Sequence, residues 1–144
     1  MFLFSRTHVV AGVLLCCLAG CSREPSRDFR RSQVQAFERG IAAFEAKDFK
    51  VANEELTVAL KNTTLHLDQL EVAHLTRAKA RIQLRDLEAA EQDLNVLELG
   101  AANMEDVWAA RGLLLKERGD TKGAELAFKV ARDLNPKVVI PTKL

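Results

Sequence analysis

The chain has 144 residues, of which 21 are basic and 20 are acidic, and 48% of its residues are hydrophobic. This length suits a single domain that buries an ordinary core without metals or disulfides. Arg6 is the only charged residue before Cys21, so the chain from Cys21 onward has no formal net charge. That balance excludes attraction to nucleic acid or to a membrane surface by charge alone.

Residues 1–20 have the three zones of an export signal. Arg6 lies in a start without acids, an apolar run of about a dozen residues follows, and small residues end the segment. The apolar run is too short to span a bilayer, which needs about 20 residues. The four residues Leu18-Ala19-Gly20-Cys21 resemble the lipobox of bacterial lipoproteins.

This resemblance implies that residues 1–20 are a signal peptide and that Cys21 is lipidated, with palmitate among the acyl chains. The lipid would anchor the protein in a cell-envelope membrane. Ser22 follows the cysteine in place of Asp, which favours the periplasmic face of the outer membrane in a Gram-negative cell. An ordinary secretory signal with a chance cysteine is the alternative. Residues 21–31 are polar and contain Pro25, so we expect a tether, whose arginines are either solvated or in contact with anionic headgroups.

In the remainder of the chain, small and apolar residues recur at matched spacings. The matching sets are Gly40, Ala78 and Gly112; Ala52, Ala90 and Ala124; Asp48, Asp86 and Asp120; and Leu56, Leu94 and Phe128. In every set the second and third members are separated by about 34 residues, which is the period of the tetratricopeptide repeat. The first spacing is slightly longer and is also the same in all four sets. Each unit of such a repeat is a helical hairpin that must stack on its neighbours.

The third unit carries this resemblance best, through Trp108, Gly112, Ala124, Phe128 and Pro136, although Arg111 and Leu115 replace the Leu and Tyr of the family pattern. The resemblance implies an all-α fold, a right-handed superhelical stack of three hairpins after the signal segment. The repeat domain would span residues 32–136, with units at about 33–66, 71–104 and 105–138, followed by a tail at 137–144.

Apolar periodicity and capping residues predict six helices near 32–46, 49–62, 69–84, 87–99, 104–118 and 121–134. Ser32 with Gln35 predicts a capping box for the first, Asn103 a cap for the fifth, and the repeated Asp a cap for the second helix of each pair. Asn135-Pro136 predicts the end of the last helix. The small residues predict close contact between the two helices of each hairpin. The packing residues are Gly40, Ala52, Leu56, Ala78, Ala90, Leu94, Trp108, Gly112, Ala124, Phe128 and Pro136.

The sequence offers little for catalysis. Glu71 and His74 have a Glu-x-x-His spacing, but a di-iron site needs two such motifs, and a surface or half-buried histidine is the simpler interpretation. Nucleophile-elbow and phosphate-loop motifs do not occur. We therefore expect no catalytic residues, no metal, no cofactor and no enzyme activity.

In the family, the first helices of the hairpins line a groove that binds a protein partner. The matching positions predict a largely apolar groove with Lys79 as its central cation, suited to an amphipathic helix or an extended peptide. The predicted groove residues are Val34, Phe37, Ile41, Phe44, Val72, Leu75, Lys79, Ile82 and Leu113. The places that hold Lys and Asn in the family's carboxylate clamps carry Phe37, Ile41, Thr76, Asp106 and Ala110, which argues against chaperone-tail binding. The alternative is that three units close the groove on itself, so that these residues are core.

Leu126, Val130 and Leu134 would face outward at the end of the stack. Either residues 138–141 fold back over them, or that end forms a homodimer or binds a partner.

These features together predict a lipid-anchored scaffold for protein–protein interaction in the cell envelope. A pilotin-like assembly factor for a pilus or secretin is a narrower alternative, and an accessory subunit or enzyme of cell-wall metabolism belongs to a different class. The enzyme alternative predicts a polar pocket with paired carboxylates or a metal, whereas the scaffold predicts an apolar groove and no titratable cluster with perturbed pKa values.

Overall fold

The computed structural model describes residues 27–61 and 64–140. Cys21, the predicted signal peptide and the first part of the tether lie outside these residues. The described residues form six helices and no strand: α1 (Arg27–Glu45), α2 (Phe49–Ala59), α3 (Leu67–Gln83), α4 (Leu87–Leu97), α5 (Met104–Glu117) and α6 (Thr121–Leu134). This confirms the predicted all-α fold.

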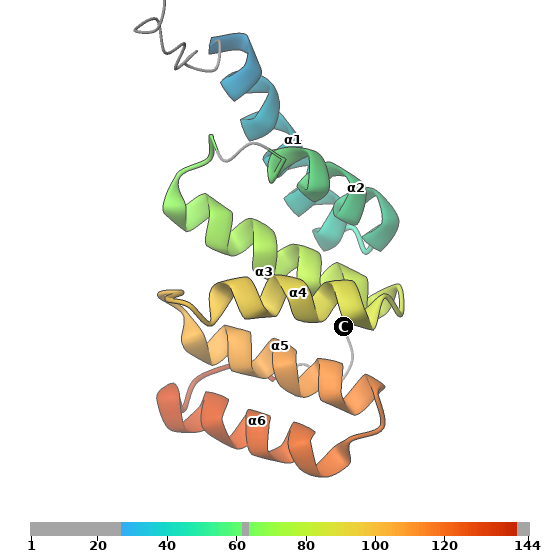
Figure 1. The fold of residues 1–144 in the computed structure, drawn as a ribbon, viewed down its shortest axis with the longest axis vertical. Helices are drawn as coiled ribbons and strands as arrows, with labels where there is room; N and C mark the ends of the chain where they lie inside the picture. The colour runs from blue at the N-terminus through green and yellow to red at the C-terminus, as the bar shows by residue number, and fades with distance from the viewer. Residues whose placement is uncertain (1–26, 62–63, 141–144) are drawn as a thin grey trace, which may run out of the picture.

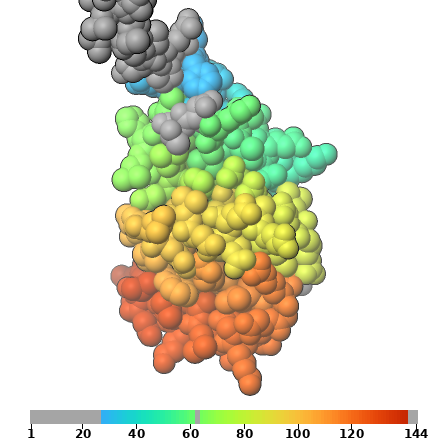
Figure 2. Space-filling view, viewed as in Figure 1, coloured from blue at the N-terminus to red at the C-terminus, as the bar shows by residue number. Residues whose placement is uncertain are grey.

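Consecutive helices pair into hairpins, α1 with α2, α3 with α4 and α5 with α6, and the hairpins stack in chain order along the molecule (Figures 1 and 2). Each first helix packs against the next first helix, α1 on α3 and α3 on α5, whereas the second helices α2, α4 and α6 make no close backbone approach to one another. A stack whose first helices touch while its second helices lie apart bends around the first helices. We call the side carried by α1, α3 and α5 the inner face.

The small residues of the first helices allow this close pairing, as predicted. A Cβ on Gly40 would lie 2.6 Å from Cγ of Leu56, and a Cβ on Gly112 would overlap the Phe128 ring. Both contacts are much closer than van der Waals distance, so a methyl group at Gly40 or Gly112 would push the second helix of that hairpin away. Ala52 and Ala90 of the opposing helices are fully buried, and Ala124 nearly so.

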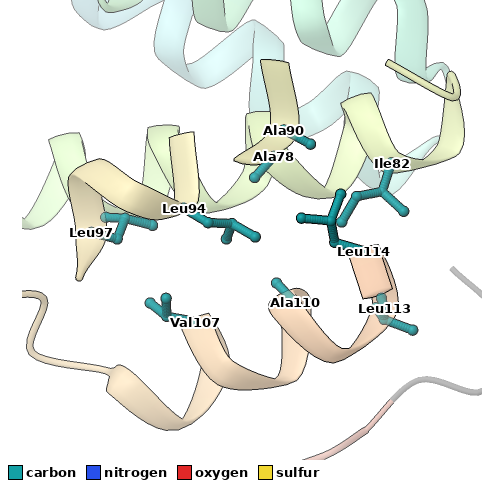
Figure 3. Close-up of a cluster of buried hydrophobic side chains, with 9 residues drawn as sticks. All are labelled: Ala78, Ile82, Ala90, Leu94, Leu97, Val107, Ala110, Leu113 and Leu114. Carbon is teal, nitrogen blue, oxygen red and sulfur yellow. The ribbon is translucent and has the colours of Figure 1, made fainter. Parts of the chain in front are cut away.

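Two apolar clusters form the core. One joins α1, α2 and α3 through Ala36, Leu56, Ala59, Leu65 and Ala73. The other joins α3, α4 and α5, and Figure 3 shows its side chains pointing toward one another between these helices. Because each cluster includes a helix of the following hairpin, each cluster joins two neighbouring hairpins.

The turn inside each hairpin has the same backbone form. Lys47, Arg85 and Gly119 adopt the left-handed conformation with φ values of 61°, 64° and 85°, and they are separated by the same spacings as the repeated small residues. The residue after each donates its N–H to the carbonyl five positions back, as in Asp48 to Ala43 at 2.9 Å. This is the Schellman helix end, which favours glycine. Only the third of these turns has a glycine.

Helix starts agree with the prediction in part. Asp48 and Asp120 accept hydrogen bonds from Val51 and Gly123 N–H at 3.2 and 2.9 Å, which confirms two of the predicted caps. Asp86 and Asn103 stand at the cap positions, but their side chains make no capping bond.

The predicted start of the first helix is wrong, since α1 begins at Arg27 and Ser32 lies inside it rather than at a capping box. Residues 27–31, expected in the tether, are helical. Arg has good helix propensity, and Asp28 in the first turn interacts favourably with the helix dipole. These effects extend the helix without any burial of residues 27–31, all of which are exposed.

The C-terminal helix ends at Leu134, as predicted from Asn135-Pro136. Leu126 and Leu134 are exposed and Val130 is half-buried, so the described part of the tail does not cover the outward leucines. None of the helices in the described ranges is long and apolar enough to cross a membrane.

Candidate functional site

The inner face carries the residues predicted to line a groove, at positions that repeat every three or four residues along α1, α3 and α5. Val34, Phe37 and Ile41 of α1 are half-buried and pack on the first core cluster. Phe44 makes an edge-on contact with Phe49, with ring centroids 5.6 Å apart. This end of the inner face is therefore apolar and partly accessible.

The middle and far end of this face are less open. Val72 on α3 is 42% exposed, whereas Ile82 and Leu113 are only 2% and 5% exposed. Leu75 is half-buried against the second cluster. Val72 is therefore the most accessible of the predicted groove residues, and Ile82 and Leu113 cannot be reached in this conformation.

Lys79 lies among these apolar side chains at the centre of the inner face. Burial lowers its pKa below the ordinary value of a lysine, and the attraction of Asp106 on α5 opposes this only in part. The charged ammonium group is therefore held at a cost in free energy. Lys79 and Asp106 thus bring opposite charges to the centre of the inner face.

A second polar site joins the first two hairpins around Asp93 of α4, whose side chain is 3% exposed. Arg77 donates from Nε and Nη2 to its two oxygens at 2.9 and 2.6 Å, and Arg81 donates from Nη1 at 2.8 Å. Nδ1 of His74 lies 2.9 Å from Oδ1. The same arginines reach back to α2, Arg81 to Asn53 at 2.9 Å and Arg77 to Thr57 at 3.3 Å. We call these six residues the Asp93 network.

Electrostatics keep Asp93 ionised. Burial alone would raise its pKa, but the hydrogen bonds from His74 and Arg77 and the charges of Arg77 and Arg81 outweigh it, so the pKa lies below its ordinary value. Four contacts fill the carboxylate, which has about four lone-pair sites. With no lone pair left for a substrate, the carboxylate is suited to holding helices together and not to acting as a base.

The sequence did not predict this network, and the expectation that no titratable cluster would have perturbed pKa values is wrong. Structural ion pairs perturb pKa values as active sites do. A signal was nevertheless present in the repeat, since Arg39 and Glu55 of the first unit occupy the same repeat positions as Arg77 and Asp93 of the second. Arg39 pairs with Glu55 at 2.8 Å. In the third hairpin Ala127 replaces the acid, and Arg111 turns instead to Glu98, just after α4, at 2.6 Å.

Glu71 and His74, which have the Glu-x-x-His spacing, form hydrogen bonds with other parts of the protein. Glu71 accepts a hydrogen bond from the Ala102 N–H at 3.1 Å, and His74 belongs to the Asp93 network. Within residues 27–61 and 64–140, no group of three His, Cys, Asp or Glu side chains could hold a metal ion.

Of the remaining packing residues, Ala78 and Leu94 are fully buried, Trp108 and Phe128 are half-buried, and Pro136 is exposed. Comparison with protein families, with curated proteins and with solved structures finds no match to this chain.

Proposed function

We propose that this chain is a tetratricopeptide-repeat scaffold, anchored through a lipid on Cys21, whose inner face binds an apolar helical or extended segment of another protein. The observation that carries the proposal is the repeat of tight helix pairs at Gly40 and Gly112, combined with an inner face that leaves Val72 accessible between half-buried apolar neighbours. Stacked hairpins give one rigid surface on which a partner can align.

The anchor and the interaction are separate parts of this proposal. The lipid would hold the stack at an envelope membrane, and two or more acyl chains suffice for stable attachment. Labelling with a palmitate analogue tests the anchor: the full chain should take up label and Cys21→Ser should not. Equal labelling of both would contradict lipidation at this cysteine.

The inner face is tested with a charge placed on an accessible apolar position. The protein is isolated from cell membranes as wild type, as Val72→Asp and as Val96→Asp, and bound proteins are quantified. Val96 is the matched control, because it is 50% exposed but lies on a second helix, α4. We expect wild type and Val96→Asp to retain the same partner and Val72→Asp to lose it. Retention by all three would contradict binding on the inner face.

The polar alternative, an enzyme or accessory subunit of cell-wall metabolism, receives less support from the side chains present. The most buried acid of the described residues, Asp93, is saturated by its own arginines and histidine. We therefore assign the Asp93 network a structural role within the scaffold.

A further inference from the structure

Hydrogen bonds hold the turn after α6 against the rest of the protein. Asn135 Oδ1 accepts a hydrogen bond from Lys137 N–H, and the Asn135 carbonyl accepts one from Val138 N–H, both at 3.0 Å. Asn135 Nδ2 donates to Oε1 of Glu105 in the first turn of α5 at 3.0 Å. The bond from Asn135 is the main cause that lowers the pKa of Glu105. The turn after α6 is thus fixed to the beginning of α5.

From this turn the segment of residues 137–140, which we call the tail segment, runs back across α5, as Figure 1 shows. Val138 and Ile140 are half-buried, while Val139 between them is 81% exposed. Such alternation is the pattern of an extended chain that lies with one side against the protein.

The middle of the inner face of α5 is buried although no further hairpin follows it in the described ranges. Ala109 and Leu113 occupy the repeat positions of Leu75 and Lys79, one unit earlier. They are 3% and 5% exposed, whereas Leu75 and Lys79 are only partly buried even though α5 follows them. Leu113 belongs to the second core cluster, with Ile82 and Leu114, so its burial needs no further cover. Ala109 lies outside that cluster, and the tail segment crosses the helix that carries it.

We propose that the tail segment is an intramolecular ligand of the inner face, seated on α5 through Val138 and Ile140. This inference rests on the proposed function, because it takes the partner to use the same face. It defines the partner's chemistry as an extended segment with apolar side chains at alternate positions. A partner that reaches Ala109 must first displace the tail segment, so the protein has a closed and an open form.

Displacement weakens the apparent affinity in proportion to the fraction of molecules that are open. A tail seated in nine molecules of ten would weaken binding about tenfold. The short connection from α6 keeps the tail at an effective concentration of roughly millimolar, which suits weak self-binding that a partner can overcome.

The experiment measures binding of a fluorescent peptide, residues 137–144, to the full chain by anisotropy. The receiving chains are wild type, the open variant Val138→Asp with Ile140→Asp, and the control Val139→Asp. We expect the open variant to bind the peptide about tenfold more tightly than the wild type, the control to match the wild type, and a peptide carrying both Asp substitutions not to bind. Equal binding by the open variant and the wild type, or no binding to either, would overturn the proposal.

A second measurement does not depend on the folding of a variant. In the wild-type chain with labelled methyl groups, nuclear Overhauser contacts between Ala109 and Val138 or Ile140 are expected, and their absence would also overturn the proposal. These contacts can be present while Val72→Asp retains every bound protein. That result would refute the proposed function, but it would support the contact of the tail segment with α5.

Discussion

Removing the charge of Asp93 tests whether the polar network holds the first two hairpins together. Asp93→Asn keeps the shape of the side chain but leaves Arg77 and Arg81, whose side chains are 12% and 15% exposed, against a neutral amide. Breaking a buried ion pair by removing one partner costs about 3 to 5 kcal/mol. Since a domain of this kind has a total stability of about 5 to 15 kcal/mol, the loss is a large fraction of it.

The assay is urea unfolding followed by far-ultraviolet circular dichroism, with a thermal scan beside it. Asp133→Asn, the same substitution at an exposed position of α6, is the control and should change stability by less than about 0.5 kcal/mol. We expect Asp93→Asn to lower the melting temperature by about 10 °C or more. The combined replacement Asp93→Leu, Arg77→Leu and Arg81→Met should recover most of the loss, because apolar residues of similar volume replace the aspartate and both arginines of the network, so that no charge is left stranded.

The reasoning is refuted if Asp93→Asn costs no more than Asp133→Asn. It is also refuted if the combined replacement costs as much as the single one, because the loss would then not come from stranded charges.

Helix packing, turn conformation and the titration of buried groups provide the other tests. Gly112→Ala should cost about 1 to 3 kcal/mol in urea unfolding, since its methyl group meets the Phe128 ring, and no loss would contradict the tight packing of α5 on α6. Lys47→Gly and Arg85→Gly should each stabilise the protein by about 1 kcal/mol because both residues have positive φ, while Gly119→Ala should destabilise it; the reverse signs would exclude the shared turn. The lowered pKa of Asp93 contributes stability that is present above the ordinary carboxyl pKa and lost as pH falls through the folded-state value, so Asp93→Asn should flatten the acid side of a stability profile. The lowered pKa of Lys79 has the opposite sense: its charge opposes folding at neutral pH, so Lys79→Met should raise the unfolding midpoint relative to Lys129→Met, with a gain that disappears at alkaline pH.

The sequence predicts the hairpins well because their contacts repeat. Gly40 and Gly112 recur at equivalent places of the repeat, and a residue without a side chain at a fixed interval in a helix has few explanations other than close packing. The helix ends at Glu45, Gln83 and Leu134 lie within one residue of the expected positions. Local turn and capping chemistry determines these ends, and such chemistry is visible in single residues.

The Asp93 network and the path of the tail segment depend on geometry that the sequence does not express. Arg77 and Arg81 could point to solvent in an isolated helix, and only the approach of α2 and α4 brings Asn53 and Asp93 within reach. The tail segment is too short to show a periodic pattern. Its course is set by the hydrogen bond from Asn135 to Glu105, a residue on the preceding helix α5. The start of α1 was misplaced because residues 27–31 form helix without burying any side chain.

Photo-crosslinking from the inner face is the most direct test of the central claim that this stack is an interaction scaffold. A photoreactive amino acid is placed at Val72, or at Val96 on α4 as the control, in the membrane-anchored protein in living cells, and cross-linked peptides are mapped on both sides of the bond. We predict that Val72 cross-links to one apolar segment of a single partner protein and that Val96 does not. Indiscriminate cross-linking from both positions, or none from Val72, would contradict a partner bound on the inner face.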